Sequence, residues 1–370
     1  MNRPFASIED AIKAIQQGRM VVVVDDEDRE NEGDLTLAAE HVTAESIAFM
    51  ATHGRGLICV ALEGETLDHL RIPLMVRDNT SPFETAFCVS VEARHGTSTG
   101  ISAQDRARTI QALIAPGAKP SDFVKPGHVF PLRARPGGVL ARTGQTEASV
   151  DLARMAGLHP SGVICEIMKD DGSMARVPDL IPFCEKHGLI MVTVADLVAH
   201  RLRIDPIVKE LECRETITAW GPLRVHRFAS LLDGGSHLAF SMGDLVGDPS
   251  AAPPLVRVHL ETLPEDLQGF AGEGSGAFQS AMKAIQGEGR GVLVYLRRHA
   301  STQGVHGETQ GSVTAPVGPL GPSDRDVGVG AQILRQLGVH EMRLLSRSET
   351  KYIGLRGFGL DVASTVPLHP

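Results

Sequence analysis

Short apolar runs alternate irregularly with helically spaced segments in the N-terminal half. The stretch from Ser7 to Asp10 has the pattern of a helix start, and Gly18 has that of the helix end. Residues 20–24 form an apolar, mostly β-branched run that predicts a buried strand. The same reasoning predicts a helix over 102–115, a strand over 163–168 and a strand passing into a helix over 192–203. The irregular order favours an α+β, or mixed α/β, fold.

The C-terminal half follows a more regular alternation. Its apolar pattern predicts strands over 255–260, 291–296 and 342–345, with helices over 277–286 and 329–337. Such alternation is typical of an α/β domain with a parallel sheet. Residues 300–323 are rich in Gly, Ser, Thr and Pro and predict a long loop.

A length of 370 residues suits two domains. Residues 204–215 are charged, contain Pro206 and predict the boundary between them. We therefore expect one domain over 1–204 and a second over 209–370.

The charge and composition of the chain limit the kinds of binding partner and the cellular compartment that we expect. The net charge is −9 and aromatic residues make up 4%, which disfavours a nucleic-acid partner. No apolar run approaches 18 residues and no leader pattern opens the chain, so we expect no membrane partner and a cytoplasmic location. No C-x-x-C pair is present, which indicates buried thiols in a reducing compartment rather than disulfides. The five cysteines are Cys59, Cys88, Cys165, Cys184 and Cys213.

An acidic string over residues 25–34 is the densest chemical signal. It holds seven carboxylates and Arg29 within ten residues, directly after the predicted strand. Carboxylates packed so closely repel one another, and hard cations such as Mg²⁺ or Mn²⁺ offset that repulsion. An EF-hand loop beginning at Asp28 fails because Ala39 stands where a bidentate Glu is needed. The alternatives are a solvated acidic loop and, for Arg29, a local salt bridge.

Three further positions are candidates for substrate chemistry. Arg142 to Thr146 precedes a helical pattern, so a helix N-terminus capped by Thr146 beside an arginine predicts a phosphate site. His128 follows a Pro-Gly turn and is a candidate general acid or base. Glu166 lies in an apolar strand, where burial would raise the pKa of its carboxyl group. The alternatives are an ordinary capped helix and a structural histidine.

Six sequence motifs follow one another along the first half of the chain. They are D-D-E-D-R-E-N-E-G-D at 25–34, H-G-R-G-L-I-C at 53–59, S-T-G-I-S-A-Q-D-R at 98–106, G-A-K-P-S-D at 117–122, P-G-H-V-F-P-L-R-A at 126–134 and G-G-V-L-A-R-T-G-Q-T-E-A at 137–148. Together they resemble the 3,4-dihydroxy-2-butanone 4-phosphate synthase family of riboflavin biosynthesis, over about residues 5–202.

The resemblance implies a lyase that converts D-ribulose 5-phosphate to L-3,4-dihydroxy-2-butanone 4-phosphate and formate. It implies an α+β fold, a homodimer and Mg²⁺ or Mn²⁺, two ions per active site. Glu30 and Gln145 would ligate metal, and His128 and Glu166 would serve the proton transfers. The implied substrate-binding residues are Arg29, Glu30, Asp34, Arg142, Thr143, Gly144, Gln145, Thr146 and Glu166.

Gln145 departs from the family pattern, which has His as the second metal ligand in R-x-G-H-T. A Gln side-chain oxygen is a hard ligand suited to Mg²⁺. It is neutral and cannot carry a proton. We therefore expect the site to persist with weaker metal affinity.

Residues 209–368 resemble GTP cyclohydrolase II. The resemblance rests on V-R-V-H at 256–259, E-G-R-G-V-L-V-Y-L-R at 288–297, D-V-G-V-G-A-Q-I-L at 326–334 and G-F-G-L at 357–360. The family's three zinc-binding cysteines are replaced here by Thr262, Glu273 and Ser275, and no cysteine follows Cys213. Ser323 stands in place of the catalytic Asp, although Arg325 remains. This implies no zinc and an inactive cyclohydrolase-like domain.

Two other functions stay open at this point. One is a bifunctional protein that also hydrolyses GTP, and the other is a non-catalytic regulator that binds sugar phosphates.

Overall fold

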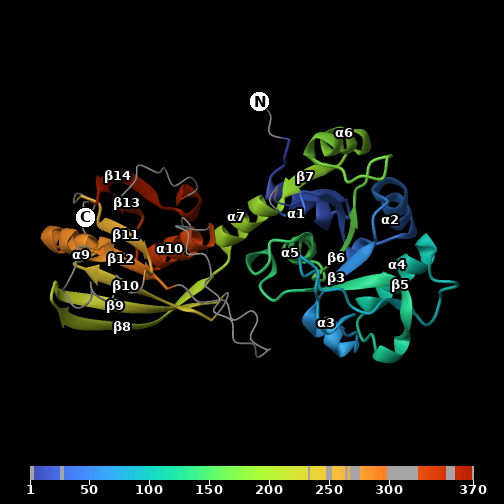
Figure 1. The fold of residues 1–370 in the computed structure, drawn as a ribbon, viewed down its shortest axis with the longest axis horizontal. Coiled ribbons are helices and arrows are strands. Elements are labelled where there is room, and N and C mark those ends of the chain that lie inside the picture. Colours follow the sequence, from blue (N-terminus) through green and yellow to red (C-terminus); the bar gives the residue numbers. More distant parts are fainter. Residues whose placement is uncertain are drawn as a thin grey trace. The chain divides into compact units, whose positions relative to one another are not determined.

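The protein, described here from a computed structural model, divides into two compact units, Met1–Arg201 and Leu202–Pro370 (Figure 1). The structure describes residues 4–25, 29–231, 234–246, 252–262, 266, 276–297, 324–346 and 355–368. Within these ranges each unit is built around one seven-stranded sheet. No helix among these residues is long and apolar enough to cross a membrane.

The first unit has a mixed sheet with strand order β4-β5-β3-β6-β2-β1-β7. Strands β1 and β7 are parallel, as are β3 and β5, and the remaining neighbours are antiparallel. The predicted α+β fold is confirmed. Its elements are α1 (Ile8–Gln16), β1 (Val21–Val24), β2 (Gly33–Ala38), α2 (Ala44–Phe49), β3 (Cys59–Glu63), α3 (Gly64–His69), β4 (Val91–Ala93), α4 (Ala103–Leu113), β5 (Phe123–Ala134), α5 (Gln145–Met155), β6 (Ser161–Glu166), α6 (Val177–His187), β7 (Ile190–Thr193) and α7 (Val194–Ile204).

Strand β1 explains why its sequence is a continuous run of valines. Side chains alternate between the two faces of a strand, and both faces of this sheet are covered. Val21 and Val23 pack in a core with α1 and α5, whereas Val22 and Val24 pack in a second core with α2, α4 and α6. Burial on both sides leaves no room for a polar position in this strand.

The second unit combines two kinds of strand pairing in the order β14-β13-β11-β12-β10-β9-β8. The predicted parallel arrangement holds for β14, β13, β11 and β12. It is wrong for β8, β9 and β10, which form antiparallel pairs. The elements are β8 (Val208–Thr218), β9 (Gly221–Ser230), β10 (Ser236–Met242), β11 (Leu255–Leu260), α9 (Ala277–Glu288), β12 (Gly291–Leu296), α10 (Asp324–Gln336), β13 (Glu341–Ser346) and β14 (Asp361–Pro367).

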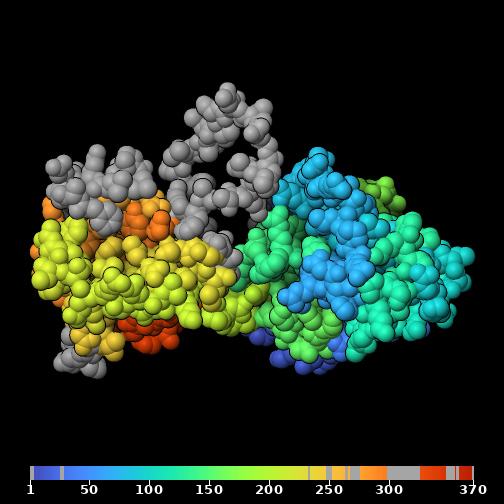
Figure 2. Space-filling model, turned by 90° about the horizontal axis from the view of Figure 1, so that it is seen from below, coloured from blue at the N-terminus to red at the C-terminus, as the bar shows by residue number. Residues whose placement is uncertain are grey.

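The charged stretch predicted as an interdomain boundary over 204–215 is largely strand, because β8 begins at Val208. Strand β8 is the outermost strand on one side of its sheet, so it is an edge strand. Charged side chains are tolerated there and discourage pairing with another chain. Figure 2 shows this strand and β9, in yellow-green, on the surface of the second unit. The loop predicted over 300–323 lies outside the described residues.

Candidate active site

A cavity of about 340 Å³ opens in the first unit, at one end of the β2–β6 pair. The loop before β2, the start of α5 and a segment over 81–87 complete its wall. The lining residues are Arg29, Glu30, Glu32, Asp34, Cys59, Ser81, Phe83, Thr85, Phe87, Leu132, Arg142, Gln145, Thr146, Ile164 and Glu166. Seven of the ten residues named from the sequence as site candidates are among them.

Two carboxyl groups face each other across the β2–β6 pair. Asp34 and Glu166 are direct partners in the antiparallel register, so their side chains project from the same face of the sheet. Glu166 Oε2 accepts a hydrogen bond of 2.8 Å from the backbone N–H of Leu57. Gly56 makes this approach possible, since a Cβ there would lie 2.4 Å from the same oxygen. The strands place both carboxyl groups, and a glycine lets the backbone hold one of them.

Burial and mutual repulsion make the ionised state of the carboxyl groups in this cluster unfavourable. Asp34 is only 1% exposed. Burial, and then the neighbouring Glu166 carboxylate, raise its pKa well above the usual value. Burial also raises the pKa of Glu166, and burial followed by the charge of Glu30 raises that of Glu32. Within the described part of the chain, Asp34 Oδ1 is buried with no hydrogen-bond partner. A donor set of this kind fits a hard cation, which would satisfy that oxygen and offset the repulsion.

The loop over 29–32 is shaped by the carboxylate of Asp25. Its oxygens accept the backbone N–H groups of Glu30 at 3.2 Å and Glu32 at 2.8 Å. Arg29 forms ion pairs with Asp25 at 2.6 Å and with Glu30 at 2.8 Å. Its guanidinium carbon also lies 5.4 Å from the centre of the Phe83 ring. Arg29 therefore makes the local salt bridge considered from the sequence while it lines the cavity.

Gln145 is 5% exposed and is oriented by the backbone of the acidic loop. Its side-chain nitrogen donates hydrogen bonds to the carbonyl oxygens of Glu32, at 2.9 Å, and Val23, at 3.5 Å. Because the amide nitrogen is committed to these two carbonyls, the amide oxygen is the atom left to face the cavity. An oxygen is the ligand atom that Mg²⁺ prefers.

Helix α5 points its N-terminus at the cavity, but its cap differs from the prediction. Gly144, and not Thr146, is the N-cap residue, and no side chain caps the helix. Thr146 lies within the first turn, where an extended N-cap conformation is unavailable. Arg142 donates to Glu147 at 2.7 Å, to the Phe83 carbonyl at 3.0 Å and to the Thr85 hydroxyl at 3.1 Å. These contacts fix the guanidinium beside a helix start, an arrangement that suits one phosphate group.

Three residues named from the sequence do not line the cavity. Thr143 is exposed and Gly144 serves as the helix cap. His128 lies on β5, where its Nδ1 is 3.0 Å from Glu92 Oε2 and its side chain is 45% exposed. Leu132 does line the cavity, and four residues of strand place His128 about 13 Å further along β5. Within a single chain, His128 stands apart from the carboxyl cluster.

Sequence reasoning missed the wall formed by residues 81–87. Ser81, Phe83, Thr85 and Phe87 line the cavity, although the segment has no regular period. Arg142 donates a hydrogen bond to this segment, and Arg29 lies against the Phe83 ring. These long-range contacts bring the segment to the site and leave no local sequence pattern. The scarcity of aromatic residues was the one available signal, because it makes two phenylalanines in one short segment conspicuous.

The model of the 3,4-dihydroxy-2-butanone 4-phosphate synthase family matches residues 9–200. The chain belongs to this family. It is an enzyme of this type, a lyase of riboflavin biosynthesis. The model of the GTP cyclohydrolase II family matches residues 209–367, so the synthase carries a domain of that second family.

Several relatives share this two-domain length. The riboflavin biosynthesis protein RibBA of Aquifex aeolicus is 50% identical, over 98% of this chain and 92% of its own. A Pseudomonas syringae protein named 3,4-dihydroxy-2-butanone 4-phosphate synthase is 47% identical, over 98% and 99%. The solved structure of RibBX, a two-domain synthase from A. baumannii, is 41% identical with a TM-score of 0.77, over 98% and 99%.

A further solved synthase structure is described as a complex with two magnesium ions. It is 47% identical with a TM-score of 0.52, and covers 54% of this chain and 99% of its own. The carboxyl cluster of the present synthase is chemically suited to the same class of ion.

We expect Gly56→Ala to lower kcat/KM for the synthase reaction by at least about tenfold, since an added Cβ displaces Glu166 and small displacements in an active site are costly. Gly64→Ala is the matched control, because a Cβ there meets only the end of the Arg133 side chain. Steady-state kinetics and circular dichroism on both variants check this. Unchanged kinetics in folded Gly56→Ala would show that Glu166 needs no such support.

Proposed function

We propose that the first unit converts D-ribulose 5-phosphate to L-3,4-dihydroxy-2-butanone 4-phosphate and formate. The observation that carries the proposal is one cavity with two halves. Carboxyl groups on β2 and β6 line one part of it, and the start of α5, which no side chain caps, lines another. A sugar phosphate is divided in the same way. Its ketone and hydroxyl oxygens lie toward one end, and its phosphate dianion lies at the other.

The phosphate end of the substrate belongs at α5. The N–H groups of the first turn of a helix, together with its dipole, attract an anion. Arg142 adds a fixed positive charge, although its ion pair with Glu147 offsets part of it. Thr146 also lines the cavity at the start of this helix. Binding there places the carbon chain of the sugar toward Asp34 and Glu166.

The carboxyl end of the cavity would hold two Mg²⁺ or Mn²⁺ ions through Glu30 and the side-chain oxygen of Gln145. Bound there, these ions supply positive charge that stabilises oxyanions and acidifies the C–H bond next to a ketone. Loading also removes the repulsion among the buried carboxylates. Gln145 contributes no charge, so the affinity for the ion rests on Glu30 and its acidic neighbours.

Asp34 and Glu166 are the groups in the cavity suited to proton transfer. Burial raises the pKa of both carboxyl groups above their ordinary values, and carboxyl groups positioned beside a substrate can transfer protons to and from it. Their opposed positions on β2 and β6 let them serve the same substrate carbon and oxygen atoms. We assign the removal and return of protons during enediol formation to this pair.

We expect Glu30→Gln to lower formate release from ribulose 5-phosphate by at least about 100-fold, because loss of a metal ligand exceeds the 10–100-fold cost of an outer-shell change. Purified wild type should release formate with Mg²⁺ and lose that activity in EDTA. Glu65→Gln, on the exposed surface of α3, is the matched control and should retain full activity.

The opposite results separate the alternatives. Sugar-phosphate binding without formate release, in a folded wild-type protein, would favour the regulator. Gln145→His would then test whether the missing histidine is the cause. Formate release that survives Glu30→Gln would contradict the assigned metal site.

We propose further that two copies associate through the first unit and that each supplies His128 to the other. The imidazole is exposed and lies away from the cavity of its own chain, so a second copy can bring it there. The first unit also has exposed apolar side chains that an association with a second copy would bury. They include Leu57, Leu74, Met75, Val76, Phe83 and Ile101.

Mixing two inactive variants tests this arrangement. After subunit exchange, a Glu30→Gln chain and a His128→Asn chain should together recover about one quarter of wild-type activity, because half of the dimers are mixed and each regains one intact site. Formate release before and after mixing measures the recovery. No recovery, with exchange verified by native mass spectrometry, would contradict the shared site.

The second unit is proposed to lack GTP cyclohydrolase activity. No cysteine follows Cys213, so the thiolates of a cyclohydrolase zinc site are missing. Thr262, at one of those positions, donates its backbone N–H to Asp266 at 2.6 Å and its hydroxyl to the same carboxylate at 3.1 Å. Relatives named only for the synthase reaction have the same two-domain length. The family match itself is the observation that keeps GTP hydrolysis as the alternative.

We expect no loss of GTP from reactions that contain the full chain, Mg²⁺ and Zn²⁺, because no thiolate remains to hold zinc at that site. Chromatography of the nucleotide over time is the measurement. Arabidopsis thaliana RIBA 1, which is named as bifunctional and is 46% identical, serves as the positive control. Zinc-dependent GTP turnover would restore the bifunctional alternative.

A further inference from the structure

A second cluster of metal-binding side chains lies on the β8–β9 ribbon of the second unit. Cys213 on β8 and His226 on β9 are direct partners in the antiparallel register, so their side chains lie on one face. Glu210 is three residues from Cys213, and in a regular strand these two side chains would point to opposite faces. The register shifts between Glu210 and Glu212. This bulge turns Glu210 onto the face that Cys213 and His226 share.

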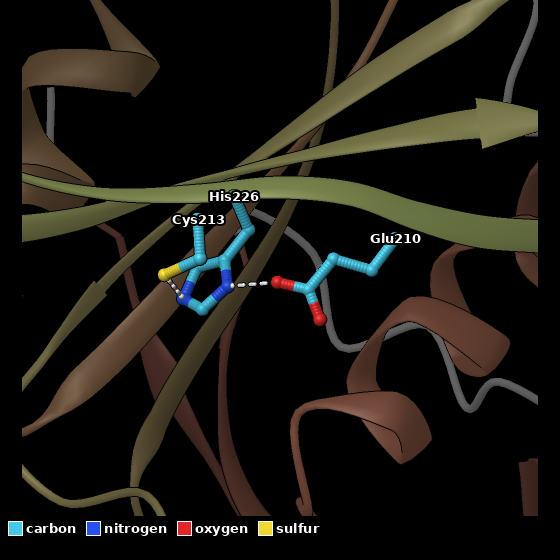
Figure 3. Close-up of side chains that lie close together, drawn as sticks. All are labelled: Glu210, Cys213 and His226. Atoms are coloured by element: carbon cyan, nitrogen blue, oxygen red, sulfur yellow. Dashed lines mark hydrogen bonds and ion pairs between the residues drawn. The ribbon is translucent and has the colours of Figure 1, made fainter.

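The imidazole of His226 lies between the other two side chains, with Cys213 near one ring nitrogen and Glu210 near the other (Figure 3). His226 Nδ1 lies 2.8 Å from Glu210 Oε1, and its Nε2 lies 4.0 Å from Cys213 Sγ. One ligand atom from each residue falls within 4.8 Å of the other two. The imidazole is 7% exposed, whereas Glu210 and Cys213 are exposed. The histidine is thus held in place while the other two side chains have room to adjust.

The neighbouring strand adds a fourth polar group. Ser241, on β10, is 1% exposed and its hydroxyl lies 2.9 Å from His226 Nε2. A hydrogen bond from a buried group orients the imidazole, as outer-shell partners do for metal-binding histidines. The ring is thus anchored from the sheet and is flanked by an exposed thiol and an exposed carboxylate, which can move to share one of its nitrogens.

The chemistry of the donors selects the ion. Thiolate and imidazole favour Zn²⁺ and related transition ions over Mg²⁺. A tetrahedral zinc ion, with bonds of about 2.0–2.3 Å, keeps its ligand atoms roughly 3.3–3.8 Å apart. The 4.8 Å limit exceeds this range by about 1 Å, which rotation of the two exposed side chains can close.

We propose that Glu210, Cys213 and His226 bind a Zn²⁺-type ion on the β8–β9 ribbon. Three protein ligands leave the fourth tetrahedral position to water. The ion would link the edge strand β8 to β9. Its sulfur and nitrogen ligands distinguish this site from the oxygen-rich synthase cavity. The expectation of no zinc concerned the cyclohydrolase ligand positions Thr262, Glu273 and Ser275, whereas strand pairing brings the present ligands together at a different place in the unit.

Cobalt binding to the full, tag-free chain tests the proposal. After treatment with EDTA and addition of excess Mg²⁺ to occupy the carboxyl cluster, one equivalent of Co²⁺ should produce a thiolate-to-cobalt charge-transfer band. One equivalent of Zn²⁺ should remove it. Cys213→Ser should abolish the band, and Glu210→Gln should weaken Co²⁺ binding by at least about tenfold.

Cys59→Ser is the matched control, because Cys59 is a thiol that lines the synthase cavity beside the candidate ligands there. The band should persist in this variant. Fluorescence of Trp220, the one tryptophan of the chain, reports whether the second unit is folded in each variant. A folded wild type without the band, or a full band in Cys213→Ser, would overturn the proposal.

Discussion

The repulsion between buried carboxyl groups at the end of β2 and β6 is the constraint on which the active site depends. Asp34 and Glu166 are opposed by strand register, so their backbones cannot move apart without breaking the sheet. Their environment disfavours ionisation, as the raised pKa values indicate. A site of this kind stores an unfavourable interaction that cations or a substrate can relieve, which couples loading to the electrostatics of the fold.

The surrounding contacts keep this unfavourable arrangement in place. Asp25 binds two backbone N–H groups of the acidic loop, and Gln145 donates to the loop carbonyl of Glu32. Arg142 joins the 81–87 segment to α5 in the same way. Asp25 holds its own loop, whereas Gln145 and Arg142 bond to segments far away along the chain. The loop geometry therefore depends on several small interactions rather than on packing alone.

The two units have divergent relations to their families. In the first unit Gln145 stands where the family pattern has histidine, and we propose that its side-chain oxygen replaces the imidazole nitrogen as a metal ligand. In the second unit the thiolates expected of a cyclohydrolase are missing altogether. The proposed metal ligands of the synthase cavity are all oxygens, whereas the proposed cation site on the β8–β9 ribbon combines a carboxylate oxygen with sulfur and nitrogen.

The sequence by itself determined most secondary structure and the family. Local patterns such as the Val21–Val24 run and the Ser7 helix start reflect interactions between near neighbours, which a linear string records. The motifs identified Glu30, Asp34 and Glu166 as candidates. Only the tertiary structure placed Phe83 in the cavity wall, made Gly144 the cap of α5 and set His128 apart. These outcomes depend on strand register, a bulge and long-range hydrogen bonds, whose free energies arise between residues far apart in the chain.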